Sequence, residues 1–334
     1  MSHRFVLAAM LLIAVLAAAQ SHAQAQAQAP AATPSRGEAS ATARGGGGVP
    51  AASGKKDRPD LQGFWTNATF TPFERPASVA GKEYFTEEEA AAYEQKRLKD
   101  EENQPQDDIH YDNVLWLREK LQKNLSNRRT SIVVDPADGR IPPQTPEARQ
   151  RLAALAAARK AADPSDVENR TLQEQCIIWT HVGPPMVPAG YNSNLQIVQT
   201  PGYVMILQEM IHDVRIIPLD DRPHLPQNIR RWQGDSRGRW EGDTLVVDTT
   251  NFTDRTNFRG STDALHVVER FTRVDAHTIR YTFTIDDATT WTKPWTGELN
   301  IRKFPDPIFE YACHEGNHDL EFLLDIAKKD LAVK

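Results

Sequence analysis

The sequence predicts a mostly β protein, an antiparallel barrel with added helices. From about residue 195 onward, strand-length segments alternate with short turns, which is the spacing of an antiparallel meander. Within Thr278–Ile285 polar and apolar residues alternate strictly, so one face of that strand is apolar and the other polar. The chain has 334 residues, 40% hydrophobic and 25% charged, a composition typical of globular proteins. A β-sandwich is the alternative fold.

The first 23 residues, Met1 to Ala23, have the features of a secretory signal peptide. Arg4 supplies the positive start, and Val6–Ala19 is an apolar stretch too short to span a bilayer with margin. The small residues of Ser21–Ala23 offer a cleavage site. We therefore expect a periplasmic or secreted protein, the alternative being an uncleaved N-terminal anchor.

Residues 24–56 are rich in Ala, Gln, Pro, Ser and Gly and contain almost no large apolar side chain. Such a segment cannot bury enough surface to fold, so we predict a disordered linker. Residues 57–334 are then a single β-rich domain with helical insertions near its N-terminal end. No later segment has eighteen consecutive apolar residues, so no membrane span is expected.

Two helices are expected between residues 57 and 175. Thr86 and Glu89 form a capping box that opens a helix reaching about Asp100. Thr145–Ala161 predicts a second helix, with Thr as N-cap and Pro at the first helical position. A short strand over Ser131–Asp135 lies between them. These helices are interpreted as additions to the sheet.

The remaining strands form the predicted meander. They are Leu195–Gln199, Tyr203–Glu209, Ile211–Pro218, a hairpin over Gly238–Asp248 turning at Glu241–Asp243, His266–Val274, Thr278–Ile285, Trp291–Arg302 and Ile308–Cys313. A tight break is expected near Met210, and His212 and Asp213 could both face inward only if a bulge fell at Met210–Ile211. With Gly63-Phe64-Trp65 on the first strand, the pattern looks like a calycin- or lipocalin-like barrel. A closing helix is expected over Leu320–Lys329.

The two cysteines, Cys176 and Cys313, both belong to the expected exported part. In an oxidising compartment a pair of cysteines most simply forms a disulfide. By the chain-entropy estimate, closing a loop of about 140 residues contributes about 4–5 kcal/mol. A metal site that uses Cys313 beside His314 and a pair of free thiols are the alternatives.

The sequence resembles a largely uncharacterised family of exported bacterial proteins. The matching segments cover nearly the whole chain after residue 57: Asp60–Trp65, Asn127–Asp135, Cys176–Trp179, Gly183–Met186, Gln208–Arg215, Gly234–Asp243 and Tyr311–Asn317. The resemblance implies an exported β-rich domain and brings no activity with it. Function has to be inferred from the chemistry of the site.

Four residues are candidates for acid–base catalysis: His212, Glu269, His314 and Glu315. The adjacent His314 and Glu315 end an expected strand, where a carboxylate can tune a histidine to act near neutral pH; the alternative is a cap for the following helix. His212 is a natural acid or base if it faces the interior. Glu269 precedes Arg270, so one of these charges must face inward, where it needs a partner or a function.

Four further residues are candidates for ligand binding: Asp213, Arg215, Tyr191 and Trp240. Asp213 and Arg215 share one strand face and could form an ion pair suited to a polar ligand, or pair on the surface. Tyr191 ends a Pro/Gly-rich loop of the kind that gates barrel mouths or simply connects strands. Trp240 lies in the charged hairpin Asp235–Asp243, where packing is the alternative role and the charges are expected to be solvated.

His314–His318 formally matches the zinc motif H-E-x-x-H, which needs both imidazoles on one helical face. Gly316 and Asn317 occupy the middle of that turn and are poor helix residues. We therefore expect no cofactor, with a zinc site at His314 and His318 as the weaker alternative.

Composition and motifs narrow the functional class. The net charge of −6 and the absence of a basic cluster argue against a nucleic-acid partner. No P-loop, dinucleotide fingerprint or G-x-S-x-G elbow is present. The first hypothesis is an exported lyase, isomerase or hydrolase acting on a small apolar or aromatic molecule in the barrel lumen by His/carboxylate chemistry. A non-catalytic periplasmic binding protein is the alternative, and a metal-dependent hydrolase is third.

Overall fold

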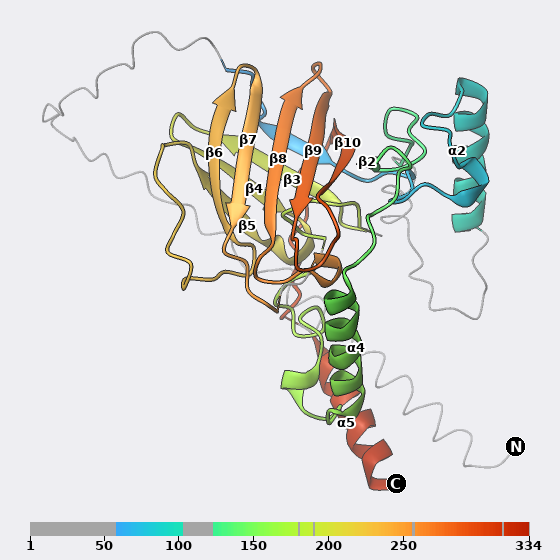
Figure 1. Cartoon of the computed structure of the whole chain (residues 1–334), viewed down its shortest axis with the longest axis vertical. Coiled ribbons are helices and arrows are strands. Elements are labelled where there is room, and N and C mark those ends of the chain that lie inside the picture. The colour runs from blue at the N-terminus through green and yellow to red at the C-terminus, as the bar shows by residue number, and fades with distance from the viewer. Residues whose placement is uncertain are drawn as a thin grey trace, which may run out of the picture. The chain divides into compact units, whose positions relative to one another are not determined.

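The computed structural model describes residues 58–102, 123–179, 181–189, 191–255, 258–315 and 317–333 (Figure 1). The expected signal peptide and linker lie outside these residues. The strands are β1 (Gly63–Thr66), β2 (Val133–Asp135), β3 (Asn194–Gln199), β4 (Tyr203–Gln208), β5 (Val214–Pro218), β6 (Asp235–Glu241), β7 (Thr244–Thr250), β8 (His266–Arg273), β9 (Thr278–Asp286) and β10 (Trp295–Lys303). The α-helices are α2 (Glu87–Glu102), α4 (Pro146–Ala161) and α5 (His318–Val333), and short 3-10 turns lie at Ala77–Val79, Val167–Asn169, Met210–His212 and Phe258–Gly260.

The strands form an antiparallel barrel that is closed except at one seam. Hydrogen-bonded neighbours follow the order β5-β4-β3-β1-β10-β9-β8-β7-β6, with β2 paired to β10. Because β1 pairs with both β3 and β10, the nine strands run in chain order around the barrel. The Cα atoms of β5 and β6 come within 8 Å of each other without a hydrogen-bonded ladder. The predicted antiparallel barrel is confirmed, and the β-sandwich is set aside.

Side-chain packing brings β5 and β6 together at this seam. A Cβ atom on Gly238 of β6 would lie 2.7 Å from Leu219 Cδ2 and 2.8 Å from Ile217 Cγ2. Both distances are shorter than carbon atoms tolerate, so a larger residue would push the two strands apart. Glycine at this position therefore allows the barrel to come close to closure.

The barrel interior is a packed core. Along β9, alternate residues are fully buried, as the sequence pattern predicts. The largest side chains with at most 1% exposure include Trp65, Phe271, Tyr281, Phe283 and Trp295. Their rings contact one another, with Phe283 and Trp295 edge to face at 6.0 Å between centroids. Each such side chain contributes about 2–3 kcal/mol by leaving water. The centre of the barrel is thus filled by protein, which leaves the expected lumen ligand no space there.

The helix starts confirm the capping predictions. Before α2, Glu89 N–H donates to Thr86 Oγ1 at 3.2 Å, and Thr86 N–H donates to Glu89 Oε2 at 2.8 Å. Before α4, Ala148 N–H donates to Thr145 Oγ1 at 3.0 Å. The closing helix is present as α5 and begins two residues before the expected Leu320.

Three strand predictions are wrong in detail. Residues 308–313 form no strand and lead to the Cys176–Cys313 disulfide instead. The strand expected from Trp291 begins only at Trp295. The expected strand from Ile211 begins only at Val214. Before it, a 3-10 turn holds Ile211 and His212 at φ of 66° and 45°, so the break near Met210–Ile211 is a turn and not a bulge.

Candidate functional site

Inside the barrel, one carboxylate on β8 is held by a side chain from the adjacent strand β9 and by one from the distant strand β5. Arg215 Nη1 and Nη2 donate to Glu269 Oε1 and Oε2 at 3.1 and 2.7 Å. The Tyr281 hydroxyl donates to Glu269 Oε1 at 2.7 Å and accepts from Met186 N–H at 2.8 Å. Arg215 is 6% exposed, whereas Glu269 and Tyr281 are fully buried. We call these three residues the barrel triad.

In the barrel triad, the positive charge of Arg215 balances the buried negative charge of Glu269. Burial and the nearby Glu269 carboxylate raise the pKa of Tyr281 well above its ordinary value, so its hydroxyl stays protonated and donates. Both Glu269 oxygens already accept charged or hydroxyl donors. Glu269 is therefore the one of the adjacent pair Glu269 and Arg270 that faces inward, and Arg215 is the partner that its buried charge needs. Its hydrogen bonds link β8 to β5 and β9 across the interior.

Asp213 does not pair with Arg215. It follows the 3-10 turn, where its Oδ2 accepts from Gln233 Nε2 at 2.6 Å and its Oδ1 from Val214 N–H at 3.0 Å. Burial raises the pKa of Asp213, and the hydrogen bond from Val214 opposes this shift. Arg215 instead points inward to a partner 54 positions later in the chain.

The predicted disulfide between Cys176 and Cys313 is present, with Cα atoms 5.7 Å apart. Asn317 Nδ2 donates to Glu174 O at 3.2 Å and contacts Cys176 Sγ at the same distance. Arg170 Nη2 donates to Leu323 O at 2.8 Å. The disulfide and these contacts fasten α5 to the segment that precedes the barrel meander.

A cavity of about 880 Å³, which we call the disulfide pocket, lies beside this bridge. Its lining includes four aromatic residues and six acidic residues: Trp179, Phe304, Phe309, Tyr311, Glu174, Glu209, Asp306, Glu310, Glu315 and Asp319. Of the described residues that line it, none is Lys, Arg or His. The pocket thus combines aromatic faces with a negative electrostatic potential.

The ends of β3 and β4 supply a fixed polar part of this lining. Glu209 is 3% exposed, and its Oε2 accepts from Asn194 Nδ2 at 2.6 Å. The backbone N–H of Glu209 also donates to Asn194 O at 3.0 Å. The buried Oδ1 of Asn194 has no hydrogen-bond partner within the described structure. Neighbouring strands therefore hold a carboxylate and an unused acceptor at the pocket.

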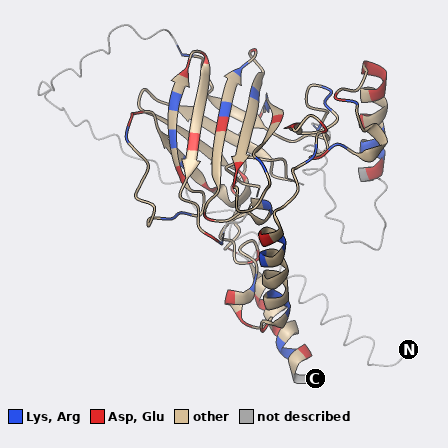
Figure 2. Ribbon diagram, viewed as in Figure 1, with Lys and Arg blue, Asp and Glu red and all other residues tan. Residues whose placement is uncertain are grey.

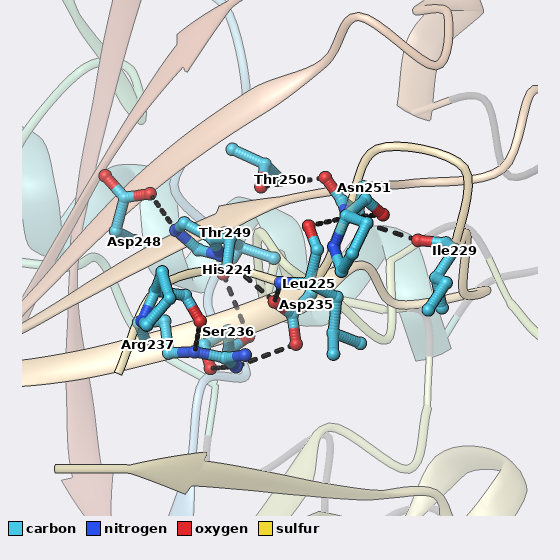
Figure 3. A network of polar contacts seen from close by, with 12 residues as sticks. His224, Leu225, Ile229, Asp235, Ser236, Arg237, Asp248, Thr249, Thr250 and Asn251 are labelled. Carbon is cyan, nitrogen blue, oxygen red and sulfur yellow. Dashed lines mark hydrogen bonds and ion pairs between the residues drawn. The ribbon is translucent and has the colours of Figure 1, made fainter. Parts of the chain in front are cut away.

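The loop 219–234, which we call the strap, is fastened over the outer face of β6 and β7 (Figure 3). His224 Nδ1 lies 3.2 Å from Asp235 Oδ2, and its Nε2 lies 2.9 Å from Asp248 Oδ1. Asp235 is 2% exposed and also accepts from Arg237 Nη1 at 2.7 Å. The expectation that the charges from Asp235 onward are solvated is wrong for Asp235, because the strap covers it.

Two further contacts complete this network. His266 Nε2 lies 2.9 Å from Asp248 Oδ2, and this hydrogen bond raises the pKa of His266 although burial opposes the shift. Burial alone would raise the pKa of Asp248, but its bonds to His266 and His224 outweigh burial and lower it. Asn251 Nδ2 donates to three strap carbonyls, of Leu225, Pro226 and Ile229, at 2.9–3.2 Å.

The remaining candidate residues are His212, the adjacent pair His314 and Glu315, and His318. His212 is exposed, with Nδ1 2.7 Å from Tyr311 O. His314 and Glu315 are exposed, and Glu315 lines the disulfide pocket. His318 is the first residue of α5 and lies 3.8 Å from Glu321. The H-E-x-x-H segment is therefore not inside a helix. Within the described ranges, no three His, Cys, Asp or Glu side chains are arranged to hold a metal ion.

The two aromatic candidates take packing positions. Tyr191 packs edge to face against Trp179, with centroids 6.0 Å apart, next to the disulfide pocket. Trp240 is half-buried against the barrel core and has the guanidinium of Arg58 5.7 Å from its ring centroid. The disulfide pocket was missed at the sequence level because its walls come from segments more than a hundred residues apart.

The fold and site define an antiparallel β-barrel with a filled interior and an acidic, aromatic pocket outside it. Comparisons with protein-family models, with curated proteins and with solved structures found no match. Among the described helices, none is both long and apolar enough to cross a membrane. Basic and acidic residues are interspersed along the described ribbon (Figure 2).

Proposed function

We propose that this protein is an exported small-molecule-binding protein, and that its ligand is a small organic cation with an apolar or aromatic body. The single observation that carries the proposal is the lining of the disulfide pocket. Four aromatic residues and six carboxylates surround about 880 Å³ there, without a basic residue among the described lining. Cavities of this size hold one drug-sized ligand.

Charge and ring geometry both favour a cation. An ammonium group gains from the quadrupole of Trp179 or Tyr311 when it lies within about 6 Å of a ring centroid. It also relieves the repulsion among the carboxylates that line the pocket. An anion would meet six carboxylates of its own sign, of which Glu174 is already paired with Arg170 at 3.6 Å.

Location in the cell is part of the same proposal. The features of residues 1–23 are those of a signal peptide, and the Cys176–Cys313 disulfide is compatible with an oxidising compartment. We place the binding site in the disulfide pocket and not in the expected lumen, because core side chains fill the barrel interior.

Calorimetric titration with three matched probes tests the proposal: benzyltrimethylammonium, benzyl alcohol and benzoate. We expect the cation to bind and benzoate to give no measurable heat. Glu310→Lys and Trp179→Ala should each weaken cation binding about tenfold or more. Glu241→Lys, which makes the same charge change at the exposed end of β6, should leave cation binding unchanged. Equal binding of all three probes would overturn the proposal.

A His/carboxylate enzyme is the second candidate function, and one observation favours it. Glu315 lines the disulfide pocket directly after His314, so a bound molecule would lie within reach of a carboxylate. In that case Glu315→Gln should retain binding of the cation while abolishing its chemical turnover, measured by mass spectrometry of the incubated ligand. Unchanged turnover in this variant would exclude the enzyme at this site.

A further inference from the structure

The carboxylates of the disulfide pocket include two groups that differ in exposure. Glu209 directly follows β4, and it is 3% exposed. Glu310, Glu315 and Asp319 are exposed and belong to the chain between β10 and α5 or to the first turn of α5. All four line the same cavity of about 880 Å³. We call the surface around Glu209 the inner wall, and the three exposed carboxylates the outer rim.

The inner wall offers hydrogen-bond acceptors to a ligand. Glu209 accepts from Asn194 Nδ2 at 2.6 Å and from Asn192 Nδ2 at 3.3 Å. Both donors are neutral amides, which hold the carboxylate in place without cancelling its charge. Asn194 also lines the cavity, and its Oδ1 has no hydrogen-bond partner in the part of the chain that the structure describes. A positively charged head group that carries N–H donors suits such a wall.

The outer rim carries more negative charge than one ammonium group can balance. Among the described residues, the carboxylates of Glu310, Glu315 and Asp319 form no hydrogen bond and no ion pair. The described lining also contains no Lys, Arg or His that could balance them. A single ammonium group held at Glu209 would leave all three rim charges uncompensated. A second positive charge on the same ligand would reduce the repulsion among them.

We propose that the ligand of the disulfide pocket is a diammonium compound, with one ammonium group at Glu209 and the other at the outer rim. An aromatic or apolar spacer joins the two groups and lies against Trp179 or Tyr311, which line the same cavity. This inference rests on the proposed function and narrows the cation to a class with two charges. Because the spacer holds the second ammonium group near the rim, its binding becomes an intramolecular step.

Calorimetry of the full chain with para-xylylenediammonium, para-methylbenzylammonium and benzenedimethanol tests the inference. These probes share one ring and carry two, one and no positive charges. We expect the dication to bind at least about tenfold more tightly than the monocation, and the neutral diol to bind most weakly. Equal affinity of dication and monocation would overturn this inference and leave the proposed function standing. Absence of binding by both cations would overturn the proposed function as well.

Substitutions at the outer rim locate the second ammonium group. Glu310→Gln combined with Glu315→Gln removes two exposed carboxylates, and we expect it to weaken dication binding about tenfold more than monocation binding. Glu321→Gln combined with Asp325→Asn removes two exposed carboxylates of α5 that do not line the cavity, and it should leave both affinities unchanged. Thermal unfolding checks that both variants fold. An equal loss for the two ligands in the rim variant, or an equal loss of dication binding in the two variants, would contradict the placement at the rim.

Discussion

The carboxylate of Glu269 has three hydrogen-bond donors within 3.1 Å, two from Arg215 and one from Tyr281. No water-exposed surface remains on Glu269 to stabilise its charge in any other way. A buried charge of this kind is tolerable only while its partners are in place. At the residue scale, the stability of the barrel therefore depends on three side chains from three strands.

Removing one charge of the barrel triad should be strongly destabilising. Glu269→Gln leaves Arg215 buried without its counter-ion, and we expect a loss of about 3–5 kcal/mol in the free energy of unfolding. Urea denaturation followed by tryptophan fluorescence measures this quantity. Glu241→Gln removes a carboxylate of the same type from the exposed end of β6, where water screens its ion pairs with Arg239 and Arg270, and should reduce stability far less. Equal effects of the two substitutions would show that the triad is not formed.

The strap is fastened to the barrel by hydrogen bonds to two aspartates. His224 lies between Asp235 and Asp248, and Asp235 also accepts from Leu225 N–H. The second carboxylate oxygen of Asp248 contacts His266 of β8. At the element scale, pH therefore acts on the contact between Asp248 and His266, beside the strap.

The stability contributed by the Asp248–His266 contact, which joins β7 to β8 beside the strap, should fall on both sides of an acidic window. The pKa of His266 is raised above 6.5, so its contribution is complete below pH 6.5 and is lost as pH rises through the raised value. The pKa of Asp248 is lowered from 3.8, so its contribution is complete above pH 3.8 and is lost as pH falls further.

Comparison of wild type with His266→Gln isolates this effect. We expect the stability difference between them to be largest near pH 5–6 and to shrink at pH 8.5. Chemical denaturation at a series of pH values measures it. A difference that stays constant from pH 5 to pH 9 would contradict the role given to the Asp248–His266 bond.

Across the whole molecule, local patterns predicted the elements better than they predicted the sites. Alternation along β9, the capping residues Thr86 and Thr145, and the cysteine pair each act within one segment or one simple pairing rule. The strand expected over Ile308–Cys313 does not form, because an apolar run does not by itself provide a neighbouring strand to pair with.

The sites depend on contacts that no local pattern contains. The partner of Arg215 lies 54 positions away on β8, and the nearer Asp213 points elsewhere. Asp235 sits in a sequence typical of an exposed turn and is buried only because the strap folds back over it. The filled lumen also results from side chains of many strands meeting at one axis.

The most direct test of the central claim is a crystal structure of the protein with benzyltrimethylammonium. We expect its density in the disulfide pocket, with the ring or ammonium against Trp179 and the positive charge among the carboxylates that include Glu209 and Glu310. Density within the barrel, beside Phe271 and Trp295, would contradict the proposed cation site, as would an empty disulfide pocket at saturating ligand.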